Sequence, residues 1–455
     1  MPLTNNSVTR HIDPTGDEIK AFLDDDGSFV QAVAIVDENG NQTATSGVPV
    51  EVNVNKINGS AGDAFNRLRV SNPYPLFEAS SRYDLNNIIW HSSTATGGSV
   101  THDATNAAIQ LTTNTQTSAS ASLVTLKNFR YQPGKGHLVQ QTLSIVNPSE
   151  ENSITKWGYF DDNDGLFFSS SGGVFGVVLR DNGTDTFVAQ SNFNLDTLDG
   201  NGQSGFNIDL SKSNIYQISF QFLGVGVAEF SVYKGDGSTI PFHRFENANT
   251  NTYQYMKTAL LPVKYEVINT DTTTAGSGIN VLCVNVSSEG GFNPLYYIIN
   301  GRSTNDFVEH GSNYEIPVLS IRSRKNVNGQ RNKVEVVPFR MTICCDSKAA
   351  IVRLRKNATL TAGVTSFTTV SDNSSMEYNT TATGLTGGLE LTTYAINKDS
   401  SADISLTPTT FDINKQSLNY NNAGQQEMLT ATIERVGTGV SNTSVLVAIE
   451  WAEVR

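Results

Sequence analysis

The chain has 455 residues, of which 38% are hydrophobic and 16% are charged, and its formal net charge at pH 7 is -13. A chain of this length exceeds one ordinary hydrophobic core, so we expect two or three domains. The negative charge repels nucleic-acid phosphates and disfavours DNA or RNA as a partner. No apolar run approaches the length of a membrane-spanning helix, so we expect no membrane insertion.

Residues 1–62 form a polar, acidic lead-in with too little apolar sequence to fold by itself. Within it, Gly16–Leu23 predicts either one short helical turn or a strand. Val33–Val36 and Val48–Val54 predict strands on either side of an Asn-Gly turn. The first residues lack a basic flank and an apolar core, so we expect no secretory signal and synthesis in a cytoplasm.

An extended segment, which we call the clasp, spans Ala64–Tyr83 and follows the lead-in. Pro73 and Pro75 exclude a regular helix there and favour extended backbone. Extended segments with large anchors dock by adding strands to sheets and burying alternate side chains, and arginine suits pairing with carboxylates at interfaces. The candidates for contact with a neighbouring subunit, or with the body of the same chain, are Phe65, Arg67, Leu68, Arg69, Val70 and Phe77.

The predicted body of the protein covers residues 63–292. Tyr216–Phe222 alternates apolar and polar residues, which predicts a strand with one buried and one solvated face. Leu223–Gly226 predicts a bend, and a second alternating strand begins near Ala228. Many short strands separated by turn signals favour an antiparallel β-sandwich or jelly roll. The sequence shows no βαβ alternation, which excludes a parallel α/β sheet.

A second antiparallel β domain is predicted for residues 293–455. Val334–Ile343, Met428–Arg435 and Ser444–Trp451 predict strands, and Pro338 places the first of them at a sheet edge or a bulge. We find no internal repeat of fixed period, which weighs against solenoids. The predicted fold is therefore mainly β: a β-sandwich or jelly-roll body, a C-terminal β domain and a small N-terminal lead-in.

Four pieces of the sequence stand out as motifs. They are Arg67–Pro73 together with the Leu-Phe pair at 76–77, Tyr131–Lys135, Trp157–Phe168 and Leu260–Val267. They resemble pieces that occur in the same order in structural proteins of tailed bacteriophage particles. The resemblance covers about residues 60–345. It implies a virion component made in the cytoplasm of a host bacterium, and it carries no catalytic residue with it.

The resemblance favours a non-enzymatic structural component, associated with the tail or baseplate. Its expected partners are other virion proteins and copies of itself. We expect the lead-in and clasp to attach the chain while the two β domains face outward. The rival expectation is that the clasp packs only inside its own chain. Two alternative functions are a head-surface decoration protein and an adhesin that binds host surface glycan, and the sequence does not choose the position on the particle.

Acidic turns are the candidates for metal binding or catalysis. The turn Asp161–Gly165 suggests calcium, but Phe160 and Ser171 stand where the helix-loop-helix calcium pattern needs acids. Asp196 and Asp199, with the first and last aspartates of that turn, could supply paired carboxylates for glycoside hydrolysis. Asp, Asn and Gly also favour turns for backbone reasons. We therefore expect no catalytic residue, no cofactor and no metal.

Two further groups of residues have chemical potential. The cysteines, Cys283 and the adjacent pair at 344–345, lack disulfide and metal spacing, so we expect buried, reduced thiols. Arg322–Lys325, with Arg331 and Lys333 just beyond, is the densest basic cluster, and we expect a solvated strand end there.

Overall fold

The computed structural model describes residues 9–12, 18–23, 29–31, 73–291, 297–406, 417–437 and 441–454. Over these residues the regular structure is almost entirely antiparallel β-strand, as predicted, with a short 3-10 helix at Gln190–Asn192. Within the same residues, no helix is long and apolar enough to cross a membrane. The chain divides into two compact units, Met1–Ile57 and Asn58–Arg455.

The first unit contains a small antiparallel sheet in the order β1-β2-β3. Its strands are β1 (Thr9–Ile12), β2 (Glu18–Leu23) and β3 (Phe29–Gln31). The sequence of Gly16–Leu23 allowed either a helical turn or a strand, and the structure forms a strand at Glu18–Leu23. The strands predicted at Val33–Val36 and Val48–Val54 lie outside the described residues.

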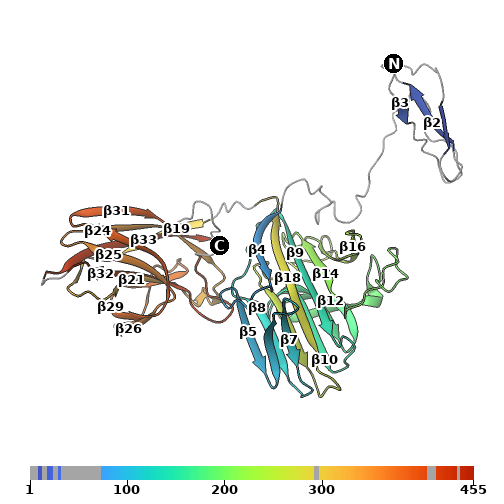
Figure 1. Ribbon diagram of the computed structural model, residues 1–455, viewed down its shortest axis with the longest axis horizontal. Coiled ribbons are helices and arrows are strands. Elements are labelled where there is room, and N and C mark those ends of the chain that lie inside the picture. Colours follow the sequence, from blue (N-terminus) through green and yellow to red (C-terminus); the bar gives the residue numbers. More distant parts are fainter. Residues whose placement is uncertain are drawn as a thin grey trace. The chain divides into compact units, whose positions relative to one another are not determined.

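Residues 74–289 of the second unit form two antiparallel sheets that share one hydrophobic core, which we call the N-terminal sandwich (Figure 1, blue to yellow). The first sheet runs in the order β13 (Thr184–Ala189), β12 (Val174–Asp181), β11 (Gly165–Ser171), β10 (Ser153–Phe160), β17 (Val263–Asn269), β8 (Ser120–Thr125) and β5 (Trp90–Ala95). The second runs in the order β16 (Thr239–Phe245), β15 (Ala228–Tyr233), β14 (Asn214–Phe220), β9 (Gly136–Val146), β18 (Gly278–Glu289), β7 (Ala108–Thr113) and β6 (Gly98–Asp103), and β4 (Tyr74–Ser80) also pairs with β18.

Aromatic rings form the centre of this core. Trp157 on β10 is fully buried and stacks on Phe168 of β11 and Phe175 of β12, with ring centroids 5.7 and 6.1 Å apart. Tyr216 on β14 of the facing sheet meets the same indole edge-on at 5.1 Å. Large rings in such offset and edge-to-face pairs contribute more than their buried area alone. The aromatic row therefore holds neighbouring strands together and joins the two sheets.

Strands β14 and β15 confirm the alternating unit predicted from the sequence, including the bend between them. Phe220 pairs with Ala228, and the bend closes through a hydrogen bond from the Gly226 N–H to the Phe222 carbonyl at 2.8 Å. The predicted solvated face is wrong, because Gln217 is only 2% exposed. β14 lies between β9 and β15, whose long polar side chains cover that face. The side-chain Oε1 of Gln217 accepts hydrogen bonds from the side chains of Gln140 and Tyr233.

The second half of the clasp is a strand of the N-terminal sandwich. β4 pairs antiparallel with β18, and Pro75 sits beside a register irregularity in that pairing, a position that tolerates proline. Leu76 is buried in the shared core, and the Phe77 ring lies 4.9 Å from Phe129 and 5.7 Å from Trp90. Phe77 therefore packs inside its own chain. Outside the described residues lie Phe65, Arg67, Leu68, Arg69 and Val70.

Residues 297–454 form a second pair of sheets around a separate core, which we call the C-terminal sandwich (Figure 1, yellow to red). One sheet runs in the order β19 (Tyr297–Ser303), β33 (Thr443–Val454), β24 (Glu335–Cys345) and β31 (Ser400–Ser405), with β20 (Val308–His310) also on β33. The other runs in the order β27 (Thr368–Thr369), β28 (Met376–Asn379), β21 (Ile316–Ser323), β32 (Met428–Arg435), β25 (Ala350–Lys356) and β30 (Leu389–Ile396). A small hairpin pairs β22 (Asn326–Val327) with β23 (Gln330–Arg331), and a separate two-stranded sheet pairs β26 (Thr359–Gly363) with β29 (Ala382–Thr386).

The C-terminal strands confirm the sequence pattern. β24, β32 and β33 cover the three predicted segments, and Trp451 on β33 is fully buried. The register between β24 and β33 shifts between Pro338 and Arg340, so the proline sits at a bulge, which was one of the two predicted positions.

Candidate functional site

The acidic turn between β10 and β11 is closed by its own first residue. One carboxylate oxygen of Asp161 accepts hydrogen bonds from the backbone N–H groups of Asn163 and Asp164, each at 2.9 Å. The Asp161 N–H in turn donates to the Asp164 carbonyl at 2.9 Å. This is the backbone role for which aspartate is favoured in turns.

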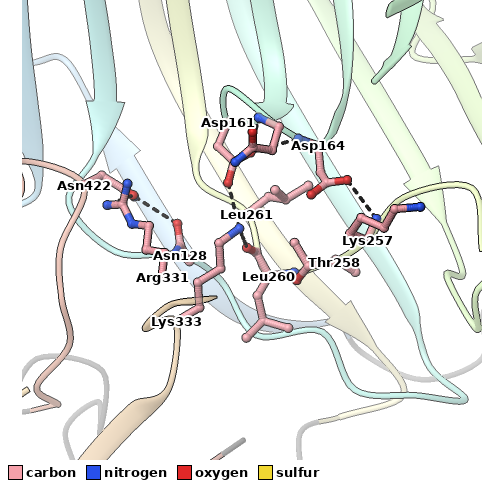
Figure 2. A network of polar contacts seen from close by, with 12 residues as sticks. Asn128, Asp161, Asp164, Lys257, Thr258, Leu260, Leu261, Arg331, Lys333 and Asn422 are labelled. Atoms are coloured by element: carbon pink, nitrogen blue, oxygen red, sulfur yellow. Dashed lines mark hydrogen bonds and ion pairs between the residues drawn. The ribbon is translucent and has the colours of Figure 1, made fainter. Parts of the chain in front are cut away.

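The second carboxylate oxygen of Asp161 binds a lysine of the C-terminal sandwich (Figure 2). The Lys333 Nζ lies 2.7 Å from Asp161 Oδ2 and 3.2 Å from the Leu260 carbonyl oxygen. Burial by itself would raise the pKa of Asp161, but the Lys333 ammonium and the N–H donors of the turn outweigh it, so the pKa is lowered. The charged form of Asp161 is therefore the form that the fold stabilises.

Asp164, at the other end of the turn, is 3% exposed and serves the fold as well. Its Oδ1 accepts a hydrogen bond from the Lys257 N–H at 2.8 Å, which fixes the chain that leads into β17 (Figure 2). Burial raises the pKa of Asp164, and the N–H donors offset this only in part. Both aspartates are thus committed to backbone and lysine partners.

Asn422 makes a second connection between the sandwiches. Its Nδ2 donates to the Thr125 carbonyl at 2.9 Å and to Asn128 Oδ1 at 3.0 Å, and its backbone N–H donates to the Leu126 carbonyl at 2.9 Å. Arg331 positions this asparagine, because its Nη2 donates to Asn422 Oδ1 at 3.2 Å. We call this set of contacts the interdomain seam, defined by Asn128, Asp161, Leu260, Arg331, Lys333 and Asn422.

The basic cluster is largely engaged and not simply solvated, which corrects the sequence-based expectation. Arg331 and Lys333 belong to the interdomain seam, and the Lys333 side chain is only 19% exposed. Arg322 forms an ion pair with Glu377, its Nε lying 2.5 Å from Oε1. The expectation failed because the carboxylate and carbonyl partners of these cations come from distant parts of the sequence.

Asp196 and Asp199 also support local structure. The carboxylate of Asp196 is 5% exposed and accepts hydrogen bonds from the N–H groups of Leu198 at 2.9 Å and Ser204 at 2.7 Å. A Cβ at Gly202 would stand 2.3 Å from Asp196 Oδ1, so only glycine fits there without a shift. Asp199 accepts from the Thr197 hydroxyl at 2.6 Å within the same loop. Asp161 and Asp164 bond to each other within one turn. The structure shows no other pairing among the four aspartates Asp161, Asp164, Asp196 and Asp199.

The cysteines differ from one another in exposure, so the expectation of three buried thiols is wrong. All are free; Cys283 is exposed, Cys344 is half-buried and Cys345 is buried. The register of β18 against β9 shifts between Val281 and Cys283, and such a bulge re-aims the side chain. Burial raises the pKa of the Cys345 thiol. Within the described residues, no group of three or more His, Cys, Asp or Glu side chains could hold a metal ion.

Two of the four motifs noted in the sequence form neighbouring strands of the N-terminal sandwich, and Phe129, which lies outside all four motifs, contacts one of these two and also Phe77. Trp157–Phe168 forms the β10–β11 hairpin, and Leu260–Val267 covers most of β17, whose Tyr265 pairs with Trp157. The third motif, Tyr131–Lys135, follows Phe129, whose N–H donates to the Leu261 carbonyl at 2.9 Å. The Phe77 ring, from the first motif, lies against Phe129. Two motifs are therefore directly paired, Phe129 links one of them to Phe77, and the acidic turn of the interdomain seam lies within Trp157–Phe168.

Comparisons with known proteins identify no family for this chain. No family model matches it, and no curated protein matches it. Among solved structures it is similar to the carbohydrate recognition domain of Emp47p, at 9% identity and a TM-score of 0.30 over 48% of this chain and 97% of that one. It is also similar to arcelin-5, a lectin-like defence protein from Phaseolus vulgaris, at 10% identity and a TM-score of 0.30 over 48% and 98%. The alginate lyase AlyC3 matches at 13% identity and a TM-score of 0.26 over 42% and 78%. Likenesses this distant assign neither a ligand nor an activity.

Proposed function

We propose that this protein is a non-catalytic structural component of a tailed-phage particle, associated with the tail or baseplate. The observation that supports the proposal is that two of the phage-like motifs, Trp157–Phe168 and Leu260–Val267, form neighbouring strands of the N-terminal sandwich. The commitment of the acidic residues to turns and to Lys333 supports the non-catalytic part.

The interdomain seam suits a structural role. It joins the two sandwiches through an ion pair and several hydrogen bonds whose groups are mostly withdrawn from solvent. A carboxylate–ammonium contact of this kind is costly to break, because either charge is then left partly buried without a partner. A seam of such contacts holds the two sandwiches together, which suits a structural protein.

Attachment is assigned to the lead-in and the first half of the clasp. Leu76 and Phe77 are used by the core of the N-terminal sandwich. We propose that Phe65–Val70 contacts a neighbouring subunit, with Arg67 and Arg69 pairing with carboxylates there. The two sandwiches then face away from the attachment point.

A glycan-binding adhesin is the second candidate function. The observation that favours it is a cavity of about 490 Å³ in the C-terminal sandwich, lined mainly by amide, hydroxyl and guanidinium groups. Groups of these kinds are the ones that fix the orientation of polar ligands in protein sites. The two functions are compatible, because particle attachment and the cavity use different parts of the chain.

Quantitative mass spectrometry of purified particles tests the particle assignment. Particles would be washed in high salt, disrupted, and separated into head and tail fractions. We expect peptides of this chain in constant ratio to a known tail protein in the tail fraction. Recovery with heads would replace the tail position by head decoration, and loss of the protein on washing would contradict a structural role.

A further inference from the structure

The cavity in the C-terminal sandwich is lined by four segments that come from three separate regions of the sequence. They are the end of β21, the turn from β25 into β26, the loop before β27, and the start of β32. Its volume of about 490 Å³ lies within the range of small-molecule sites. The lining residues are Arg322, Asn357, Ala358, Thr359, Leu360, Thr365, Phe367, Gln425, Gln426 and Met428.

Arg322 is held in place with part of its guanidinium uncommitted. Its Cζ lies 3.8 Å from the centroid of the Phe367 ring, and its Nε is bonded to Glu377. Among the described residues, the two Nη atoms have no hydrogen-bond partner. The N–H groups of the two Nη atoms can donate to a carboxylate in two-point geometry.

The amides of the cavity are oriented by bonds that leave their other ends unused. Asn357 Oδ1 accepts from the Met428 N–H at 2.9 Å, so Nδ2 is its remaining donor. Gln426 Nε2 donates to the Ser323 carbonyl and to Glu377, so Oε1 is its remaining acceptor. Gln425 Oε1 has a long contact of 3.5 Å with Asn421, and its Nε2 has no partner among the described residues.

The uncommitted groups therefore comprise more fixed donors than acceptors, and the hydroxyls of Thr359 and Thr365 can act as either. Ala358, Leu360 and Met428 add apolar surface. Arg322 already shares its charge with Glu377, so a complementary ligand presents several acceptors, among them a carboxylate that takes the two remaining Nη groups, and a C–H face. Nucleic acid has the charge but is disfavoured by the net charge of -13 on the whole chain.

We propose that this cavity binds one carboxylate-bearing sugar unit of a polysaccharide. The carboxylate pairs with the Nη atoms of Arg322, and the ring hydroxyls meet Asn357 and Gln425. The inference deepens the second candidate function by naming the sugar class and its place. It is independent of particle attachment, so its failure would leave the tail assignment untouched.

Isothermal titration of the full chain tests the proposal with three probes: a short oligomer of D-galacturonate, the matching oligomer of neutral D-galactose, and acetate. We expect binding of the uronate oligomer at least about tenfold tighter than that of the neutral oligomer, since hydrogen bonds to charged groups are the stronger ones. Acetate should bind far more weakly than the uronate. Equal binding of acetate, equal binding of the neutral sugar, or absence of uronate binding would each overturn the proposal.

Variants locate the site. Arg322→Gln should weaken uronate binding about tenfold or more. Gln425→Ala should weaken it several-fold, and it leaves the fold intact because Gln425 is exposed. The matched control is Arg340→Gln, which removes a guanidinium paired with Glu450 on the other sheet of the same sandwich. If Gln425→Ala binds as wild type, or if Arg340→Gln weakens binding as much as Arg322→Gln, the ligand does not occupy this cavity.

Discussion

At the scale of single residues, the core of the N-terminal sandwich contains a histidine that the fold keeps neutral. His137 on β9 is 1% exposed, and its ring lies 5.1 Å from the rings of Tyr159 and Phe220. Burial lowers the pKa of His137 to about 3, because the imidazolium form would lose its hydration. The unfolded chain has no such constraint, and its histidine titrates near the ordinary value of about 6.5.

This difference predicts a loss of stability in acid. Below about pH 6.5 the unfolded chain takes up a proton that folded His137 refuses until about pH 3, so stability falls across that window. At pH 5 the loss from this residue is about 2 kcal/mol relative to pH 7. Denaturant titrations at both pH values, on wild type and on His137→Phe, measure it. The variant should lose correspondingly less stability; parallel losses in the two proteins would show that His137 is not the group responsible.

Asp196 allows a second prediction at this scale. Asp196→Asn keeps the shape of the loop but weakens the two hydrogen bonds that its carboxylate accepts, and we expect a loss of roughly 1–2 kcal/mol in unfolding free energy. Wild type and variant alike should release no reducing ends from host surface polysaccharide. Release by wild type that disappears in Asp196→Asn, with the fold retained, would make this aspartate catalytic.

At the scale of elements, the acidic turn and the segment that precedes β24 form the contact that we expect to matter most. Lys333→Met leaves Asp161 partly buried without its ammonium partner, and we expect it to cost roughly 1–3 kcal/mol at pH 7. The pKa of Asp161 is lowered in the folded protein. The stabilisation is therefore present above the unfolded-state pKa and is lost as the pH falls through the folded-state value.

Chemical denaturation of wild type and Lys333→Met at pH 7 and in strong acid checks this, and the difference between them should shrink in acid. The matched control is Lys234→Met. The Lys234–Asp236 pair is 3.9 Å long and solvent-exposed, so its loss should change stability by no more than about 0.5 kcal/mol. If the two lysine variants behave alike, the contact with Asp161 contributes nothing to the stability of the seam.

The elements also show how far the sequence leads. Period-two alternation predicts β14 and β15, and Pro338 predicts a bulge, because these signals are local. The burial of Gln217 and the exposure of Cys283 depend on neighbouring strands and on a register shift, which no local pattern encodes. The seam was missed for the same reason, since Asp161 and Lys333 are 172 positions apart. Their charges were visible in the sequence, but their pairing was not.

At the scale of the whole molecule, the structure shows that the clasp cannot be removed as a unit, because its second half is strand β4. Deleting residues 1–82 would remove the lead-in and all of the clasp except Tyr83. It would also delete β4, with buried Leu76 and the ring of Phe77 that packs on Phe129. Loss of such core side chains destabilises a domain by several kcal/mol, so a failure to assemble would not be informative. A truncation that begins at Pro73 keeps the strand and removes only the proposed attachment segment.

Incorporation of this truncated chain into particles is the direct test of whether the residues before Pro73 attach the protein to the particle. Tagged full-length protein and tagged residues 73–455 would be supplied to infected cells that lack the native copy, and purified particles would be assayed for the tag. Circular dichroism and melting confirm beforehand that the truncated chain keeps its fold. We expect the full-length protein to sediment with particles and the truncated protein to stay unassembled. Equal incorporation of both proteins, or absence of the full-length protein from particles, would contradict it.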